Sequence, residues 1–119
     1  MASSVLFSFV LPSAAQVPSA DCNTVIRQGS TVNWMTLVNG LPFNRGIFRI
    51  DAVRSDGGWS ATSTNQSGGT RPIGVNGRLN SSSFTLLNAA SSETWTGSCN
   101  QRGIGGQING GSGIRFVIW

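Results

Sequence analysis

The sequence predicts a single all-β domain, either a sandwich or a small barrel of short antiparallel strands. Apolar and polar residues alternate in several short segments, and no useful window has the 3.6-residue spacing of an amphipathic helix. Turn-forming Asn, Asp and Gly separate these segments at intervals of roughly 8 to 12 residues. A chain of 119 residues has room for one hydrophobic core, so we expect one domain over residues 1–119.

The expected strands follow one another along the whole chain. Alternate apolar residues place one face of each strand in the core. The segments are Val5–Leu11, Thr31–Val38, Ile47–Arg54, Phe84–Leu86, Trp95–Cys99 and Ile114–Ile118. The expected turns are Asn39-Gly40, Asp56-Gly57-Gly58, Gly68-Gly69, Asn76-Gly77 and Asn109-Gly110-Gly111. The Gly-, Ser- and Asn-containing stretch from Trp59 to Thr70 is expected to be a hairpin or a long loop.

Residue types that are missing exclude several kinds of chemistry. The chain has no His, Lys or Tyr. Nucleophile systems that depend on His, His-ligated zinc, the P-loop lysine and Schiff-base catalysis are therefore excluded. Only a carboxylate pair such as Asp51 with Glu93 remains for acid–base catalysis, and the expected strands do not bring these residues together. We expect a protein that is not an enzyme and holds no cofactor or metal.

The charge of the chain is positive and comes entirely from arginine. Eight Arg stand against four acidic residues, which gives a net charge of +4. This balance suits an anionic partner, because the guanidinium group binds carboxylate and phosphate oxygens. No run of basic residues follows a phosphate backbone, so nucleic acid is not the expected partner. No apolar stretch is long enough for a membrane span.

The two cysteines leave two possibilities open. Cys22 and Cys99 are far apart in the sequence, and no CxxC pattern or acidic cluster indicates a metal or redox site. They form either one disulfide across a long loop or two buried thiols in a reducing compartment. If they are oxidised, we expect an extracellular or surface-exposed protein.

Several of these features together resemble an immunoglobulin variable-type domain similar to lambda light chains. Cys22, Trp34 and Cys99 match the family's two cysteines and core tryptophan, and the segment Gly111–Ile118 resembles its Gly-x-Gly final strand. The region Arg71–Leu86 resembles strands D and E. The resemblance implies an immunoglobulin-like β-sandwich, an inter-sheet disulfide between the two cysteines and an Arg78–Glu93 ion pair.

The same resemblance implies a binding surface made of loops that gather at one end of the sandwich. The loops are Asn23–Asn33, Asp51–Gly58 and Asn100–Asn109. Trp59 follows a turn and has two possible roles: it is exposed and stacks on a ring, or it caps one end of the core. The candidate ligand-binding residues are Arg27, Asn33, Arg54, Trp59, Asn100, Gln101, Arg102 and Ile104.

Three functions are therefore expected from the sequence. The first is recognition of a protein or glycan through these loops. The second is a structural or assembly role, as in a virion, fibre or filament, with homo- or hetero-oligomer contacts through the sheet faces. The third is a lectin-like, carbohydrate-binding barrel that uses Trp59. A shorter match, Thr94–Gly97 with Ile108-Asn109, resembles a strand pair of biotin-binding barrels, but the other parts of that barrel are not at the expected positions.

Overall fold

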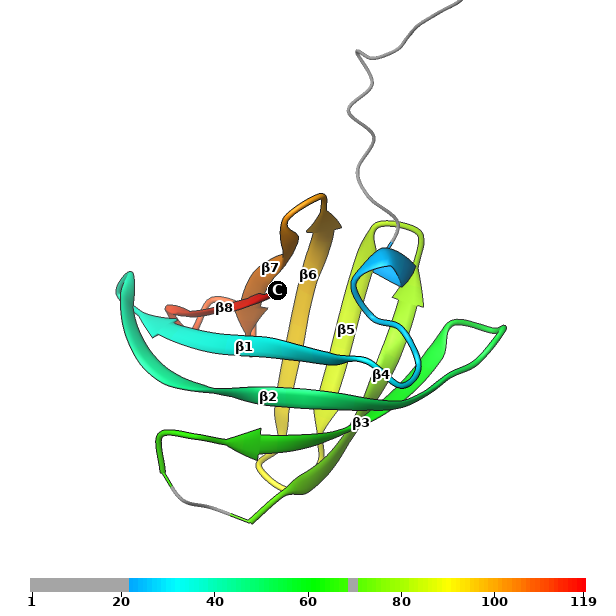
Figure 1. Cartoon of the computed structure of the whole chain (residues 1–119). Helices are drawn as coiled ribbons and strands as arrows, with labels where there is room; N and C mark the ends of the chain where they lie inside the picture. Colours follow the sequence, from blue (N-terminus) through cyan, green and yellow to red (C-terminus); the bar gives the residue numbers. More distant parts are fainter. Residues whose placement is uncertain (1–21, 69–70) are drawn as a thin grey trace, which may run out of the picture.

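Eight antiparallel strands make up most of the part of the chain that the structure describes. The computed structural model describes residues 22–68 and 71–119, so the expected strand Val5–Leu11 lies outside it. A short 3-10 helix, η2 (Cys22–Thr24), precedes the strands (Figure 1). The strands are β1 (Thr31–Val38), β2 (Leu41–Val53), β3 (Gly58–Asn65), β4 (Ile73–Asn80), β5 (Ser83–Asn88), β6 (Glu93–Asn100), β7 (Gly103–Ile108) and β8 (Ile114–Ile118).

The strands form a closed barrel in which neighbours in sequence are neighbours in space. Each strand pairs antiparallel with the next, and β8 pairs with β1 to close the ring. The all-β antiparallel fold class is confirmed. Of the two expected architectures, the structure has the small barrel rather than the immunoglobulin-like sandwich of two separate sheets. The β1–β8 pairing is the reason, because it joins the first and last strands and leaves no open sheet edge.

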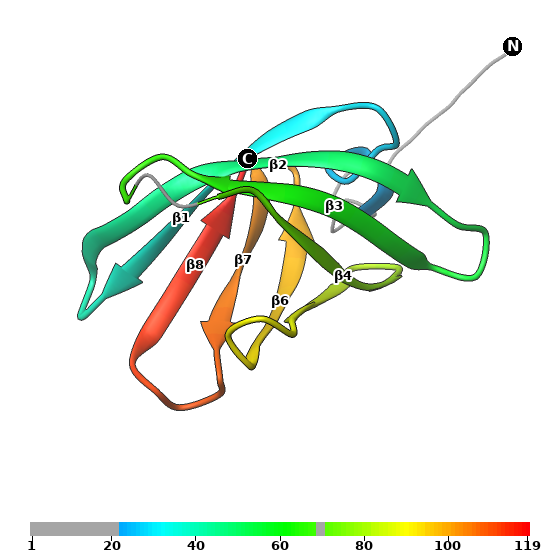
Figure 2. The same ribbon diagram turned by 90° about the horizontal axis from the view of Figure 1, so that it is seen from below.

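The barrel is flattened into two layers that cross. In Figure 1, β1, β2 and β3 run across β5 and β6, and Figure 2 shows β6, β7 and β8 side by side beneath β2 and β3. The long strand β2 contains a register shift between Ile50 and Ala52, where a bulge adds local twist. The side chains between the two layers form the core.

Two of the turn predictions have opposite outcomes. Asn39 and Gly40 both have positive φ, 52° and 80°, and make the two-residue hairpin between β1 and β2. This geometry matches a type I′ turn, which Asn-Gly favours. Asn76-Gly77, in contrast, lies inside β4 and is not a turn. Gly77 is opposite Trp59 in the register of β3 and β4, so the glycine makes room for an indole rather than a chain reversal.

The stretch from Trp59 to Thr70 was expected to be a hairpin or a long loop, and its first part is the first strand of the β3–β4 hairpin. Residues up to Asn65 belong to β3, which is paired on both sides. Its inward side chains include Trp59 and Ala61, both buried. Small polar residues at the outward positions concealed the alternation that is typical of a strand.

Aromatic side chains form a continuous cluster along the barrel interior. Trp59 stacks on Phe84 with ring centroids 5.4 Å apart, and Phe84 contacts Phe116 at 5.7 Å. Phe116 lies 4.8 Å from Trp95, which in turn packs edge-on against Trp34 at 5.9 Å. Trp34 is buried, so the prediction that it belongs to the core is confirmed.

Candidate functional site

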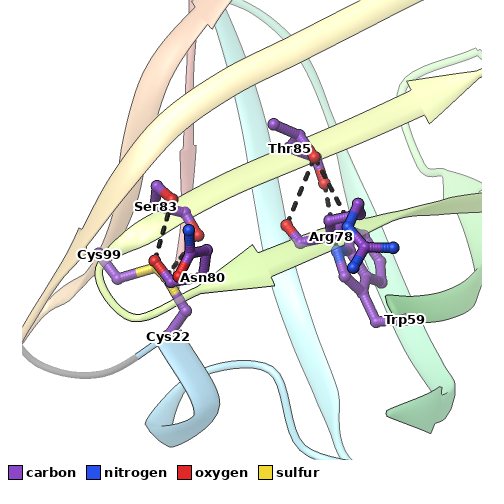
Figure 3. The surroundings of a disulfide bond; sticks show 7 residues. All are labelled: Cys22, Trp59, Arg78, Asn80, Ser83, Thr85 and Cys99. Atoms are coloured by element: carbon purple, nitrogen blue, oxygen red, sulfur yellow. Dashed lines mark hydrogen bonds between the residues drawn. A yellow bond between two sulfur atoms is a disulfide. The ribbon is translucent and has the colours of Figure 1, made fainter. Parts of the chain in front are cut away.

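One end of the barrel, where β1 begins and β2 ends, is covered by the segment around η2. We call it the closed end. Cys22 in η2 is bonded to Cys99 near the end of β6 (Figure 3). The backbone N–H of Cys22 donates to the carbonyl of Ser81, and Ile26 is completely buried. The expected disulfide is therefore present, and it fixes the chain across this end. A disulfide is stable in an oxidising environment.

The interior changes from apolar to polar toward the opposite end, which we call the mouth. There β1, β3 and β5 end and β2, β4 and β6 begin; its turns lie along the left side and the bottom of the barrel in Figure 1. A cavity of about 320 Å³ opens at this end. We call it the mouth cavity. Its floor is apolar and its rim is polar. The floor consists of Trp34, Phe48, Val75, Leu86 and Trp95, and the rim contains Thr36, Asn44, Ser63, Asn65, Asn88, Ser91 and Glu93, with Arg71 and Ile73.

Two hydroxyl side chains of the cavity wall are buried. Thr36 and Ser63 are each 7% exposed and are the buried polar residues of the described chain. The Thr36 hydroxyl accepts from the backbone N–H of Asn44 at 3.0 Å and donates to the carbonyl of the same residue at 3.4 Å. The hydroxyl of Ser63 makes no hydrogen bond to any described residue. Among the described residues no fully buried side-chain nitrogen or oxygen lacks a hydrogen bond, so the Ser63 oxygen is accessible from the cavity and available to a molecule there.

Three further rim residues present polar groups from the strand ends. The side-chain oxygen of Asn65 accepts from the backbone N–H groups of Ser67 and Gly68, and that of Asn88 accepts from Ala90. Their amide N–H groups make no hydrogen bond within the described chain. The floor residue Trp95 donates its indole N–H to the Glu93 carboxylate at 3.2 Å. The rim therefore holds both donors and acceptors next to an apolar floor, which is the usual composition of a small-molecule pocket.

The candidate ligand-binding residues from the sequence do not lie at the mouth. Seven of them lie near the closed end, where the first loop, the β2–β3 loop and the β6–β7 turn come together. Arg27 and Arg54 line one shallow depression there, and Asn100, Arg102 and Ile104 line another beside Trp119. The remaining members are Asn33, whose backbone pairs with Trp119, and Gln101 in the β6–β7 turn.

Two of these candidates are not accessible to a partner. The exposed alternative for Trp59 is wrong, because Trp59 is 0% exposed in the core and its indole N–H donates to the carbonyl of Thr85 (Figure 3). Ile104 was expected to anchor a partner, but it is 3% exposed and faces the core. Both lie at inward positions of paired strands, and strand parity controls their burial.

The expected ion pair between Arg78 and Glu93 is not formed. Arg78 lies toward the closed end and donates to the carbonyl of Asp56 at 2.8 Å, whereas Glu93 lies at the mouth. The register explains the separation, because Arg78 is opposite Thr85 and Glu93 is opposite Asn88. Within the described residues, the ion pairs are Arg49–Asp51 and Arg54–Asp56, both at 4.0 Å and exposed.

The rim residues were missed by sequence reasoning, although the sequence contains a signal for them. Along the buried face of β3, the residues change from Trp59 and Ala61 to Ser63 and Asn65. On β5 the same face changes from Phe84 and Leu86 to Asn88. These changes from apolar to polar residues predict a shared rim only if the barrel is a meander. In a meander, the ends of β1, β3 and β5 lie beside the beginnings of β2, β4 and β6.

The fold and this cavity together define a class of protein: an eight-stranded up-and-down barrel that is closed at one end and open at the other. Barrels of this strand number are wide enough to hold one small ligand. Comparison with models of protein families, with curated proteins and with solved structures finds no match in any of the three. Membership of the immunoglobulin variable-type family, which the sequence resemblance implies, therefore stays a prediction.

Long apolar helices and metal-binding clusters are both missing from the part of the chain that the structure describes. No helix there is long and apolar enough to cross a membrane. No group of three or more Cys, Asp or Glu side chains in residues 22–68 and 71–119 is placed to hold a metal ion.

Proposed function

We propose that the protein binds a small organic molecule in the mouth cavity. The observation that carries this proposal is the convergence of an apolar floor and a polar rim, from six strands, on one opening. Polar groups at this opening, such as the Ser63 hydroxyl, make no hydrogen bond to a described residue and can bind a ligand. They are explained if a ligand, or water that a ligand displaces, satisfies them.

The dimensions of the mouth cavity restrict the ligand. A volume of about 320 Å³ holds roughly ten water molecules, so a molecule with one or two rings fits and a folded partner does not. The floor contains Trp34, Phe48 and Trp95, which offer aromatic contact to a flat ring. The polar rim would then orient the groups attached to that ring.

The test is isothermal titration calorimetry with a panel of small probes. The panel contains naphthalene derivatives that are cationic, neutral and anionic, together with glucose and with biotin, which is included because Thr94–Gly97 and Ile108-Asn109 resemble a strand pair of biotin-binding barrels. Those two segments belong to neighbouring strands, with Trp95 opposite Ile108. We expect at least one ring-bearing probe to bind with a Kd of about 1 mM or lower.

Two leucine variants test whether a probe binds in the mouth cavity or elsewhere on the protein. Ser63→Leu fills the cavity from its wall and is expected to abolish binding. Thr64→Leu is the matched control, because the neighbouring residue points to the outer face of the same strand and does not line the cavity. The proposal is wrong if no probe binds, or if Ser63→Leu binds every probe as well as the unmodified protein does.

The other functions that the sequence predicts have less support than binding of a small molecule in the mouth cavity. Recognition of a protein or glycan, assembly through the sheet faces and location outside the cell all stay predictions. Arg27, Arg54 and Arg102 are exposed at the closed end and remain available to an anionic surface. Exposed Leu41, Phe43 and Trp119 remain available for contacts with another protein. No enzymatic role is proposed.

A further inference from the structure

The mouth cavity contains one acidic side chain, and its position restricts the charge of the ligand. Glu93 is the first residue of β6 and is half-buried on the inward face. Trp95, two residues later, lies on the same face and belongs to the floor. The carboxylate is therefore placed where the polar rim meets the aromatic floor.

One of the two oxygens of this carboxylate accepts no hydrogen bond within the described chain. Oε1 of Glu93 accepts the indole N–H of Trp95 at 3.2 Å. Oε2 has no hydrogen-bond partner among the described residues, and no described arginine forms an ion pair with it. A carboxylate beside apolar surface is strongly stabilised by a donor, above all a charged one.

The aromatic floor next to Glu93 favours the same kind of group. Trp34, Phe48 and Trp95 form one contacting cluster, with centroid distances of 5.8 to 5.9 Å between them. A cation near aromatic rings is attracted by their negative faces, and the attraction is stronger where water is excluded. A ring that carries a protonated amine would therefore satisfy both the floor and the carboxylate.

Arg71 is the one other charged residue that lines the cavity, and it has the opposite sign. It is exposed to solvent at the outer rim. Water and salt screen an exposed charge more strongly than a half-buried one. For this reason Glu93 is expected to dominate the interaction with a ligand that lies on the floor.

We infer that the ligand of the mouth cavity is an organic cation, a ring-bearing amine whose N–H group is held by Oε2 of Glu93. This inference rests on the proposed function and adds the chemical class of the ligand. Three probes with the same ring test the inference separately from the proposed function. They are 2-naphthylmethylamine, 2-naphthalenemethanol and 2-naphthoate, and each is titrated by calorimetry at pH 7 and low salt. The amine is expected to bind about 10- to 100-fold more tightly than the alcohol, the range for a hydrogen bond to a charged group.

Two charge variants complete the test. Glu93→Gln keeps an oxygen that accepts from Trp95, so the fold is expected to persist, as circular dichroism can verify. The variant should bind the amine and the alcohol about equally, because the charge that favours the amine is removed. Arg71→Gln is the matched control, and it should bind the amine at least as tightly as the unmodified protein does.

The outcomes distinguish the inference from the proposed function. If the alcohol or the naphthoate binds best, or if Glu93→Gln leaves amine binding unchanged, the cationic ligand is wrong and the small-molecule site stands. Naphthoate binding that is lost in Arg71→Gln would identify an anion site instead. A third case is that none of the three probes binds but another member of the panel does, and Ser63→Leu abolishes that binding. In this case too, only the inference is overturned. If nothing binds, both are wrong.

Discussion

At the scale of single residues, the barrel interior depends on cross-strand pairs of tryptophan and glycine. Trp34 is opposite Gly46 across β1 and β2, and Trp59 is opposite Gly77 across β3 and β4. A Cβ atom at Gly46 would collide with the indole of Trp34, and one at Gly77 would lie 2.9 Å from Nε1 of Trp59 and also against the carbonyl of Thr85. An indole covers each glycine, so these glycines contribute space rather than backbone freedom.

Gly77→Ala is therefore expected to lower the free energy of unfolding by about 1–3 kcal/mol, because the added methyl group collides with the backbone carbonyl of Thr85 and overpacks the contact with Trp59. Urea unfolding followed by tryptophan fluorescence measures the change. Gly74→Ala is the control, since it lies in the same strand, is exposed and has no neighbour within 4 Å of the added atom. Equal effects of the two substitutions would contradict the packing explanation.

At the scale of elements, hydrogen bonds from Asn and Asp side chains hold the turns between strands. In the β2–β3 turn, Oδ1 of Asp56 accepts the backbone N–H of Gly58 at 2.9 Å. This bond is the main cause that lowers the pKa of Asp56 below its ordinary value of 3.8; partial desolvation opposes it, and Arg78 and Arg54 assist it. A carboxylate whose pKa is lowered in the folded state stabilises the fold above its unfolded pKa.

The stabilisation of the fold by the ionised carboxylate of Asp56 should disappear in acid. Asp56→Asn keeps a side-chain oxygen in the turn but does not titrate. The difference in unfolding free energy between the unmodified protein and Asp56→Asn is expected to narrow as the pH falls below 3.8 and through the lower pKa of the folded state. Thermal or urea unfolding at a series of pH values measures it. A difference that stays constant over this range would show that the charge of Asp56 does not stabilise the turn.

Elements were predicted best where alternation and turn chemistry agreed. Thr31–Val38 is a strand with the expected bounds, and Asn39-Gly40 is the expected turn. β3 was missed because Ser and Thr at its outward positions are typical of loops as well as of strands. Gly77 was misread for a related reason: local sequence does not distinguish a glycine that bends the chain from one that accommodates an indole on the next strand.

At the scale of the whole molecule, the two ends of the barrel differ in construction. The closed end has a disulfide, a buried Ile26 and a backbone hydrogen bond from Cys22 of η2 to Ser81 in the β4–β5 turn. The mouth has a cavity and a polar rim. The disulfide and the candidate binding site are thus at opposite ends of the barrel. The cysteines can therefore be substituted without a change in the residues that line the mouth cavity.

The double variant Cys22→Ala, Cys99→Ala tests this separation. Loss of a cross-link with a sequence separation of 77 residues is expected to lower the free energy of unfolding by about 4 kcal/mol in the chain-entropy description. Probe binding at the mouth should persist under conditions where the variant is folded. Urea unfolding and calorimetry measure the two effects. A stability change below about 0.5 kcal/mol would contradict the role of the cross-link, and loss of probe binding in a folded variant would contradict the separation.

The sequence by itself determined that the chain is all-β, that Trp34 lies in the core and that several Asn-Gly and Asp-Gly pairs reverse the chain. These properties depend on strand parity and on the φ values that each residue tolerates, which are local. Only the tertiary structure decided that Cys22 and Cys99 are bonded, that the first and last strands pair and that polar residues from separate strands line one mouth. These facts depend on which strand ends come together, and side-chain alternation is the same in a sandwich and in a barrel.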